Sequence, residues 1–127
     1  MSKNQIGESG LKDTGAREIM MTGMIREPRT EKGRFDLISP IAMRRLAIHY
    51  ERGGKKYEDR NWEKGGQLSR YLCSAISHLN DYQEGCTLED HLAAAAWNIF
   101  SIIHTEEMVQ RGLLPKELSD LPTYLGE

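Results

Sequence analysis

The residues best suited to chemistry gather where two predicted helices meet. His78, Asp81 and Glu84 follow one another at intervals of three, so they lie along one broad side of a helix near its C-terminus. The next helix opens on the run Glu89–His91. If a helix hairpin brings the two ends together, these carboxylates and imidazoles can hold a hard divalent cation, which prefers oxygen ligands and keeps some of its water.

The same residues also have a purely structural interpretation. Acidic side chains at a helix N-terminus stabilise the helix by about 0.3–1 kcal/mol each, which is reason enough for Glu89 and Asp90 to be there. A histidine beside an apolar stripe, such as His78, is more often a hydrogen-bonded core residue than a ligand. Both interpretations of the cluster stay open.

A second candidate region is the loop at 52–66, where basic side chains alternate with the aromatic residues Tyr57 and Trp62. The basic residues are Arg52, Lys55, Lys56, Arg60 and Lys64. Ammonium and guanidinium groups bind phosphate oxygens and aromatic rings stack on bases, so the loop suits a phosphorylated planar ligand. Acidic residues at 58, 59 and 63 reduce its net charge to +2, so a salt-bridged surface loop explains the pattern equally well.

Asn98 follows His91 by seven residues, two helical turns, within an apolar stretch. A buried amide needs hydrogen-bond partners, and these are either the edge of a nucleobase or a backbone carbonyl across the hairpin. We interpret the neighbouring Trp97 as a core residue rather than a platform for base stacking.

Three helices must position these candidates. The first begins at Ser39–Pro40, which supplies an N-cap and a proline at the first helical position, and it is expected to end at Gly53–Gly54. The second spans about 67–84 and shows one apolar stripe. The third spans about 88–111 and is expected to start at Thr87.

A short connection predicts that the second and third helices pair antiparallel. With the turn centred near Cys86, Asp81 lies opposite His91 and His78 lies opposite Ala94. The fold class predicted is all-α, a small helical bundle with a helix hairpin, an extended N-terminal arm and a short C-terminal tail.

Length and charge limit the partners. The chain has 127 residues and a net charge of −2, which predicts one helical domain at 32–127 behind an arm at 1–31. No global positive field draws the protein to nucleic acid or to an anionic membrane, so we expect neither as a partner. Without a secretion signal or a spanning segment, a cytoplasmic location is expected. A domain this small buries its apolar faces poorly, which favours a homo-oligomer with the arm across a neighbouring subunit.

Four stretches of the sequence are similar to one known family. They are Lys-Gly-Arg-Phe-Asp-Leu-Ile at 32–38, Lys-Tyr-Glu-Asp-Arg-Asn-Trp-Glu-Lys-Gly at 56–65, Leu-Ser-Arg-Tyr-Leu at 68–72 and Glu-Asp-His-Leu-Ala-Ala-Ala-Ala-Trp-Asn at 89–98. Over about 32–122 the chain resembles the phage dATP/dGTP diphosphohydrolase N-terminal domain family, a relative of the MazG-like enzymes. The resemblance implies an all-α pyrophosphohydrolase of the host cytoplasm. Such an enzyme cleaves a purine dNTP, dGTP or dATP, to dNMP and pyrophosphate with Mg²⁺ or Mn²⁺, as a dimer or tetramer.

Two hypotheses follow. In the first, the chain is this metal-dependent enzyme, with His78 and Asp81 as catalytic residues and His78 as the general base or its orienting partner. The expected metal ligands are Asp81, Glu84, Asp90 and His91. The expected substrate contacts are Lys55, Lys56, Tyr57, Arg60, Trp62, Lys64, Arg70 and Asn98.

The second hypothesis is a catalytically inactive phage factor that binds a nucleotide or a host protein. It is motivated by the predicted second and third helices, which lack the EExxE and ExxD strings that MazG-like enzymes carry there.

Overall fold

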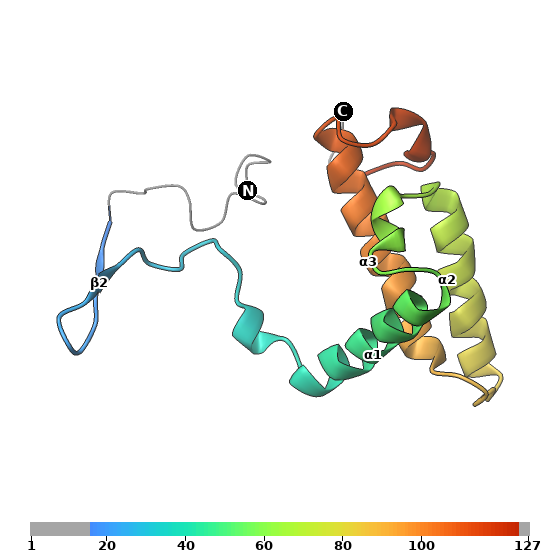
Figure 1. Cartoon of the computed structure of the whole chain (residues 1–127), viewed down its shortest axis with the longest axis horizontal. Coiled ribbons are helices and arrows are strands. Elements are labelled where there is room, and N and C mark those ends of the chain that lie inside the picture. The colour runs from blue at the N-terminus through green and yellow to red at the C-terminus, as the bar shows by residue number, and fades with distance from the viewer. Residues whose placement is uncertain (1–15, 125–127) are drawn as a thin grey trace. The chain divides into compact units, whose positions relative to one another are not determined.

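The computed structural model describes residues 16–124 and divides the chain into two units, one ending at Ser39 and the other beginning at Pro40. The second unit contains the three expected helices, with one short 3-10 turn between the first two and another after the third (Figure 1). These elements are α1 (Pro40–Lys56), η3 (Asn61–Lys64), α2 (Leu68–Gln83), α3 (His91–Gln110) and η4 (Lys116–Leu118). The predicted all-α class is confirmed. None of the helices in the described part of the chain is long and apolar enough to cross a membrane.

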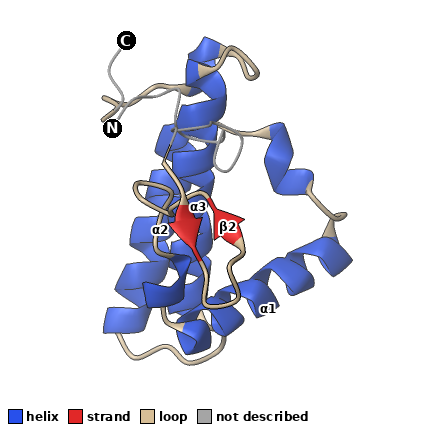
Figure 2. Ribbon diagram, turned by 90° about the vertical axis from the view of Figure 1, so that its left-hand side faces the viewer, coloured by secondary structure: helices blue, strands red, loops and turns tan. Residues whose placement is uncertain are grey.

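Helices α2 and α3 form the expected antiparallel hairpin, and they lie side by side in both ribbon views (Figures 1 and 2). Leu68 and Ala75 of α2 are buried, as is the alanine run at 93–95 of α3. Because alanine side chains are short, the two helix axes can approach closely along this seam. Close approach is what allows polar side chains near the turn to reach across from one helix to the other.

The connection between α2 and α3 is shaped by the capping of both helices. Gly85 has a φ of 87°, and the N–H groups of Gly85 and Cys86 donate back to the carbonyls of Tyr82 and Asp81, which is a Schellman motif. Helix α3 begins at His91, because the Asp90 carboxylate accepts from the N–H of Ala93 as its N-cap. The start expected at Thr87 is therefore wrong by one turn.

Helix α1 packs against α3 and runs to Lys56, past the glycine pair where its end was expected. Neither Gly53 nor Gly54 has a positive φ, and the N–H of Tyr57 continues the helical ladder by donating to the Gly53 carbonyl. A Cβ on Gly54 would lie 2.5 Å from a carboxylate oxygen of Asp59. Here glycine leaves room for the following loop and does not end the helix.

The N-terminal unit contains a short strand pair that the sequence did not predict (Figure 2). Strand β1 (Glu18–Ile19) pairs antiparallel with β2 (Ile25–Arg26), and a turn with Gly23 at a φ of 90° joins them. One 3-10 turn, η2 (Phe35–Leu37), follows. The expected arm at 1–31 lies partly outside the described residues, and its packing on a neighbouring subunit stays a prediction.

Leu68 gives a direct test of the hairpin core, because its side chain is 0% exposed. Truncating a buried leucine removes its packing and leaves a cavity, so Leu68→Ala should lower the free energy of unfolding by about 2–5 kcal/mol. Leu88→Ala is the matched control: Leu88 is 95% exposed in the connection, and its loss should change stability by less than about 0.5 kcal/mol. Urea denaturation followed by circular dichroism measures both. Equal stability of the two variants would contradict this packing.

Candidate functional site

The candidate site is a cluster of His78, Asp81 and His91 at the turn end of the hairpin. Each contributes one potential ligand atom, and the three atoms all lie within 4.8 Å of one another. The Nδ1 atoms of the two histidines are 3.0 Å apart, and Nδ1 of His91 is 4.0 Å from Oδ2 of Asp81. His91 is only 6% exposed, whereas His78 and Asp81 are half-buried. The cluster therefore has a buried floor and an accessible side.

Two further side chains contact the cluster. Oε1 of Glu89 lies 3.4 Å from Nδ1 of His78 and 3.8 Å from Nδ1 of His91. On the other side of the His91 ring, Nε2 is 3.2 Å from Sγ of Cys86. Both nitrogens of the buried imidazole therefore have polar neighbours, and Glu89, which is more exposed, stands at the edge of the cluster.

The predicted register brought Asp81 to His91, and the structure brings these two together. His78 was placed opposite Ala94 but contacts His91, because His91 and Ala94 are three residues apart on one face of α3 and two imidazole side chains reach further than the methyl group of Ala94. Glu84, an expected metal ligand, instead accepts a hydrogen bond from Nδ2 of Asn80 at 3.2 Å. It does not join the clustered group.

Asp90, the other expected metal ligand, points to α1. The Arg45 guanidinium donates to it in a bidentate pair, Nε to Oδ2 at 2.7 Å and Nη2 to Oδ1 at 2.6 Å. Oδ1 also accepts the capping bond from Ala93. These bonds hold the pKa of Asp90 at about 2, well below its ordinary value, chiefly because Arg45 stabilises the ionised form. Asp90 thus joins α1 to the start of α3, and its role as a ligand stays a prediction.

His49 on α1 is a neighbour of the cluster that the sequence reasoning missed. Burial lowers the pKa of His49, and the charges of Glu89 and Asp90 offset only part of that shift. Its ring centroid lies 6.0 Å from that of Trp97. The available signal was its position four residues after Arg45, which places both on one face of α1.

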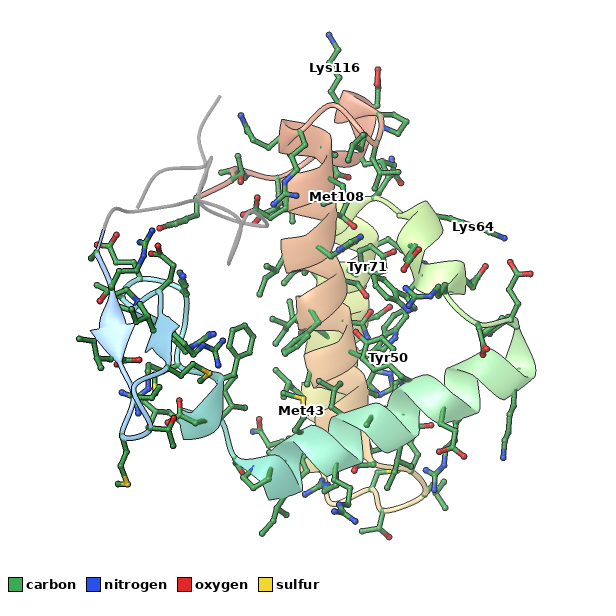
Figure 3. All side chains as sticks on the ribbon, turned by 60° about the vertical axis from the view of Figure 1, so that its left-hand side comes forward. Met43, Tyr50, Lys64, Tyr71, Met108 and Lys116 are labelled. Carbon is green, nitrogen blue, oxygen red and sulfur yellow. The ribbon has the colours of Figure 1, made fainter. Side chains whose placement is uncertain are left out.

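The basic loop is largely paired within itself. Lys64 bonds to Glu58 at 2.6 Å, Arg60 pairs with Glu63, and Lys55 lies 3.7 Å from Glu51 of the preceding helix. The Lys56 ammonium lies 5.3 Å from the centroid of the Tyr57 ring, and the side chain of Lys64 points out to solvent (Figure 3).

The loop and the cluster lie in different parts of the helical unit. The ring of Trp62 packs edge-on against His104, with centroids 4.9 Å apart. His104 follows His91 by thirteen residues on α3, which at about 1.5 Å per residue is about 20 Å along the helix. Helix α1 passes both regions, since His49 neighbours the cluster and Tyr50 packs on Trp62.

Of the remaining candidates, Asn98 and Trp97 lie in the packed interior and Arg70 lies on the surface. Asn98 is buried, and its Nδ2 donates to the Ala94 carbonyl at 2.9 Å, within its own helix and not across the hairpin. Trp97 packs among His49, Tyr50 and Tyr71, in agreement with the core interpretation. Arg70, an expected substrate contact, is exposed on α2.

Comparison with known proteins identifies the family. The sequence model described as "dATP/dGTP diphosphohydrolase, N-terminal" matches residues 23–112. This match covers more than half of the chain and includes all three helices and the whole cluster, so the chain belongs to that family. The family name indicates nucleotide hydrolysis at family level. Searches of curated proteins and of solved structures returned no significant match.

The Arg45–Asp90 pair makes a testable contribution to stability. Asp90→Ala loses both the cap and the ion pair, and should lower the free energy of unfolding by about 1–2 kcal/mol. Asp90→Asn keeps a capping oxygen and loses only the charge, so it should cost less, about 0.2–1 kcal/mol.

The Arg45–Asp90 pair also predicts how the free energy of unfolding changes with pH. Because the pKa of Asp90 is depressed in the folded state, its stabilisation is complete above about pH 4 and is lost as the pH falls toward about 2. Urea denaturation across that range should show a smaller acid-induced loss for Asp90→Asn than for wild type. Parallel curves would show that the pair does not contribute.

Proposed function

We propose that the chain hydrolyses a purine deoxynucleoside triphosphate, dATP or dGTP, to the monophosphate and pyrophosphate at the cluster around His91. The observation that carries the proposal is that the residues matched by the family include the side-chain cluster. The family match names a nucleotide diphosphohydrolase, and it encloses a part-buried group of imidazoles and carboxylates with an accessible side.

In this reaction a bond forms between the water oxygen and a phosphorus atom, and the bond between the α- and β-phosphoryl groups breaks. Pyrophosphate leaves, and the proton of the water must pass to a base. We assign that proton to Glu89, whose side chain is 54% exposed and whose Oε1 lies beside Nδ1 of His78. His78 then orients the base, one of the two roles expected of it. Asp81 supplies the second carboxylate of the cluster.

The donor atoms of the cluster are not the ones that the expected cation prefers. Two of the three clustered donors are imidazole nitrogens, whereas Mg²⁺ and Mn²⁺ are best served by oxygen ligands. We therefore place the expected Mg²⁺ or Mn²⁺ on the triphosphate of the substrate. A cation there neutralises phosphate charge during the transfer.

For the rest of the substrate we propose a path along α1. The phosphates lie at the cluster near His49, and the nucleoside extends toward the loop that follows Lys56. Tyr57 is 67% exposed at that end, so its ring is accessible to a base. Arg60 and Lys64, which pair with Glu63 and Glu58, line the end of this path where the base would lie.

The activity is tested with a panel of dNTPs and NTPs and added Mg²⁺ or Mn²⁺, with products separated by chromatography. We expect dNMP and pyrophosphate from a purine dNTP. Asp81→Asn and Glu89→Gln should each reduce turnover by about 100-fold or more, because each removes a charged group at the cluster. Glu117→Gln is the control, since Glu117 lies on η4 at the far end of the hairpin, and it should keep full activity.

A folded wild-type protein that releases no product from any nucleotide would refute the proposal. Calorimetric binding of a nucleotide without turnover would instead support the nucleotide-binding factor.

We also propose that the chain assembles as a two-fold homodimer through the uncovered side of the hairpin. Six large apolar side chains there are between 39% and 57% exposed. They are Leu72, Ile76, Leu79, Ile99, Phe100 and Ile103. Helical spacing places the six on one side of the hairpin and His78 and Trp97 on the other, which α1 covers. An exposed apolar face of this kind is typical of an interface.

Light scattering at micromolar concentration should give the mass of two chains. Ile76→Asp puts a charge in the middle of the uncovered face and should give a monomer that keeps its helical content. Ile41→Asp, at an exposed position of α1, is the control and should remain dimeric. A monomeric wild type would contradict this assembly.

A further inference from the structure

The donor atoms of the cluster match a different cation from the one the triphosphate carries. His78 and His91 present their Nδ1 atoms to each other, and Asp81 adds one carboxylate oxygen. Imidazole nitrogen favours Zn²⁺ and its borderline neighbours, whereas Mg²⁺ is bound by oxygen and gives up its water reluctantly. Two histidines with one carboxylate is a ligand set of catalytic zinc sites.

The spacing of the donors agrees with this ligand type. Around a tetrahedral Zn²⁺ with bonds of about 2.0–2.2 Å, ligand atoms lie about 3.3 Å apart. The two Nδ1 atoms are 3.0 Å apart, and Nδ1 of His91 lies 4.0 Å from Oδ2 of Asp81. Only small side-chain movements are therefore needed to place the three donors on one ion. We propose that His78, Asp81 and His91 hold a borderline divalent cation of the Zn²⁺ class, bound by the chain itself.

The electrostatics of the cluster favour a cation. Two imidazole lone pairs cannot face each other at 3.0 Å unless one ring donates a proton to the other or a positive ion lies between them. Asp81 and Glu89 supply negative charge on the accessible side. The charge of Arg45, which pairs with Asp90 at the start of α3, is neutralised by that bidentate pair.

Cys86 completes the site as a positioning residue. With Nδ1 of His91 directed at the cation, Nε2 must carry the proton, and Sγ of Cys86 lies 3.2 Å away to accept it. Partners of this kind fix the tautomer and the orientation of a ligating histidine. The sulfur of Cys86 lies beside Nε2 of His91, on the side of that ring turned away from the cluster, so Cys86 is not a ligand in this arrangement.

Three ligands from the chain leave a fourth position open, which is the arrangement of catalytic and not structural zinc sites. Glu89 stands next to that position, 3.4 Å from Nδ1 of His78. When this nitrogen binds the cation it has no hydrogen to donate to Glu89, so His78 then positions the base only by holding the cation beside it. The part this cation plays in hydrolysis rests on the proposed function, but its binding rests only on the side chains described here.

The test uses Co²⁺ as a visible probe on the full chain, freed of metal with a chelator. We expect one Co²⁺ per chain, with the intense visible absorption of a four-coordinate ion. Zn²⁺ should displace it in equal amounts, and a large excess of Mg²⁺ should not. His78→Gln and His91→Gln should abolish the spectrum, and Cys86→Ala should weaken binding by about 10–100-fold. His104→Gln, on the same helix but packed on Trp62, is the matched control and should bind as wild type does.

Circular dichroism shows whether the buried His91 variant folds, and the half-buried His78 variant tests the site independently of that outcome. The proposal is overturned if the folded wild type gives no Co²⁺ spectrum, if His78→Gln binds as tightly as wild type, or if Mg²⁺ competes as well as Zn²⁺. Metal binding without nucleotide turnover would overturn only the proposed function. Turnover by a protein that binds no Co²⁺ would overturn only the metal site.

Discussion

The Asp90 carboxylate fixes where the third helix begins and what it is attached to. One oxygen caps the helix through Ala93 while both oxygens receive Arg45 from α1. His91 is the next residue, so its position in the cluster follows directly from these bonds. A group held in this way is ordered before any ligand arrives, and preorganisation of this kind is what a binding site requires. The burial of His91 costs little desolvation energy, because both of its ring nitrogens have polar neighbours.

The alanine run at 93–95 fixes the position of His78, as the Asp90 bonds fix that of His91. Because these side chains are small, α2 approaches closely enough for His78 to meet His91. Close approach also buries polar residues further along α3, and each finds a hydrogen-bond partner, either on its own helix or on α2. Ser101 donates to the Trp97 carbonyl, and Thr105 bonds to Tyr71, whose pKa is raised chiefly by burial. The seam is thus tight and yet hydrogen-bonded, which suits a hairpin that must hold side chains in fixed positions.

The sequence predicts those features that depend on local patterns. Apolar periodicity predicts three helices, and the short connection between two of them predicts the hairpin and the meeting of Asp81 with His91. Features set by distant residues escape it. Arg45 and Asp90 are 45 residues apart, and nothing local indicates that this carboxylate pairs with an arginine of the first helix. Gly53 and Gly54 resemble a helix end, yet neither adopts a positive φ and the helix continues to Lys56, while Gly54 leaves room for the Asp59 side chain. His78 meets His91 and not Ala94 because both positions of α3 share one face and only the long imidazole reaches across to another ring.

The placement of α1 connects the site to the rest of the molecule. It crosses only one side of the hairpin, where it contributes Arg45, His49 and Tyr50. That side consequently contains the histidines of the cluster and the ring of Trp97, while the opposite side keeps large apolar residues exposed. In the proposed function and assembly, a charged substrate and a second apolar surface place opposite demands on solvation, because the first needs water and paired charges and the second needs water excluded. Placing the two on opposite sides of one hairpin would let a domain of three helices meet both demands. In the proposed dimer, a change made on the apolar side would then alter assembly while the arrangement of donors around His91 stays as it is.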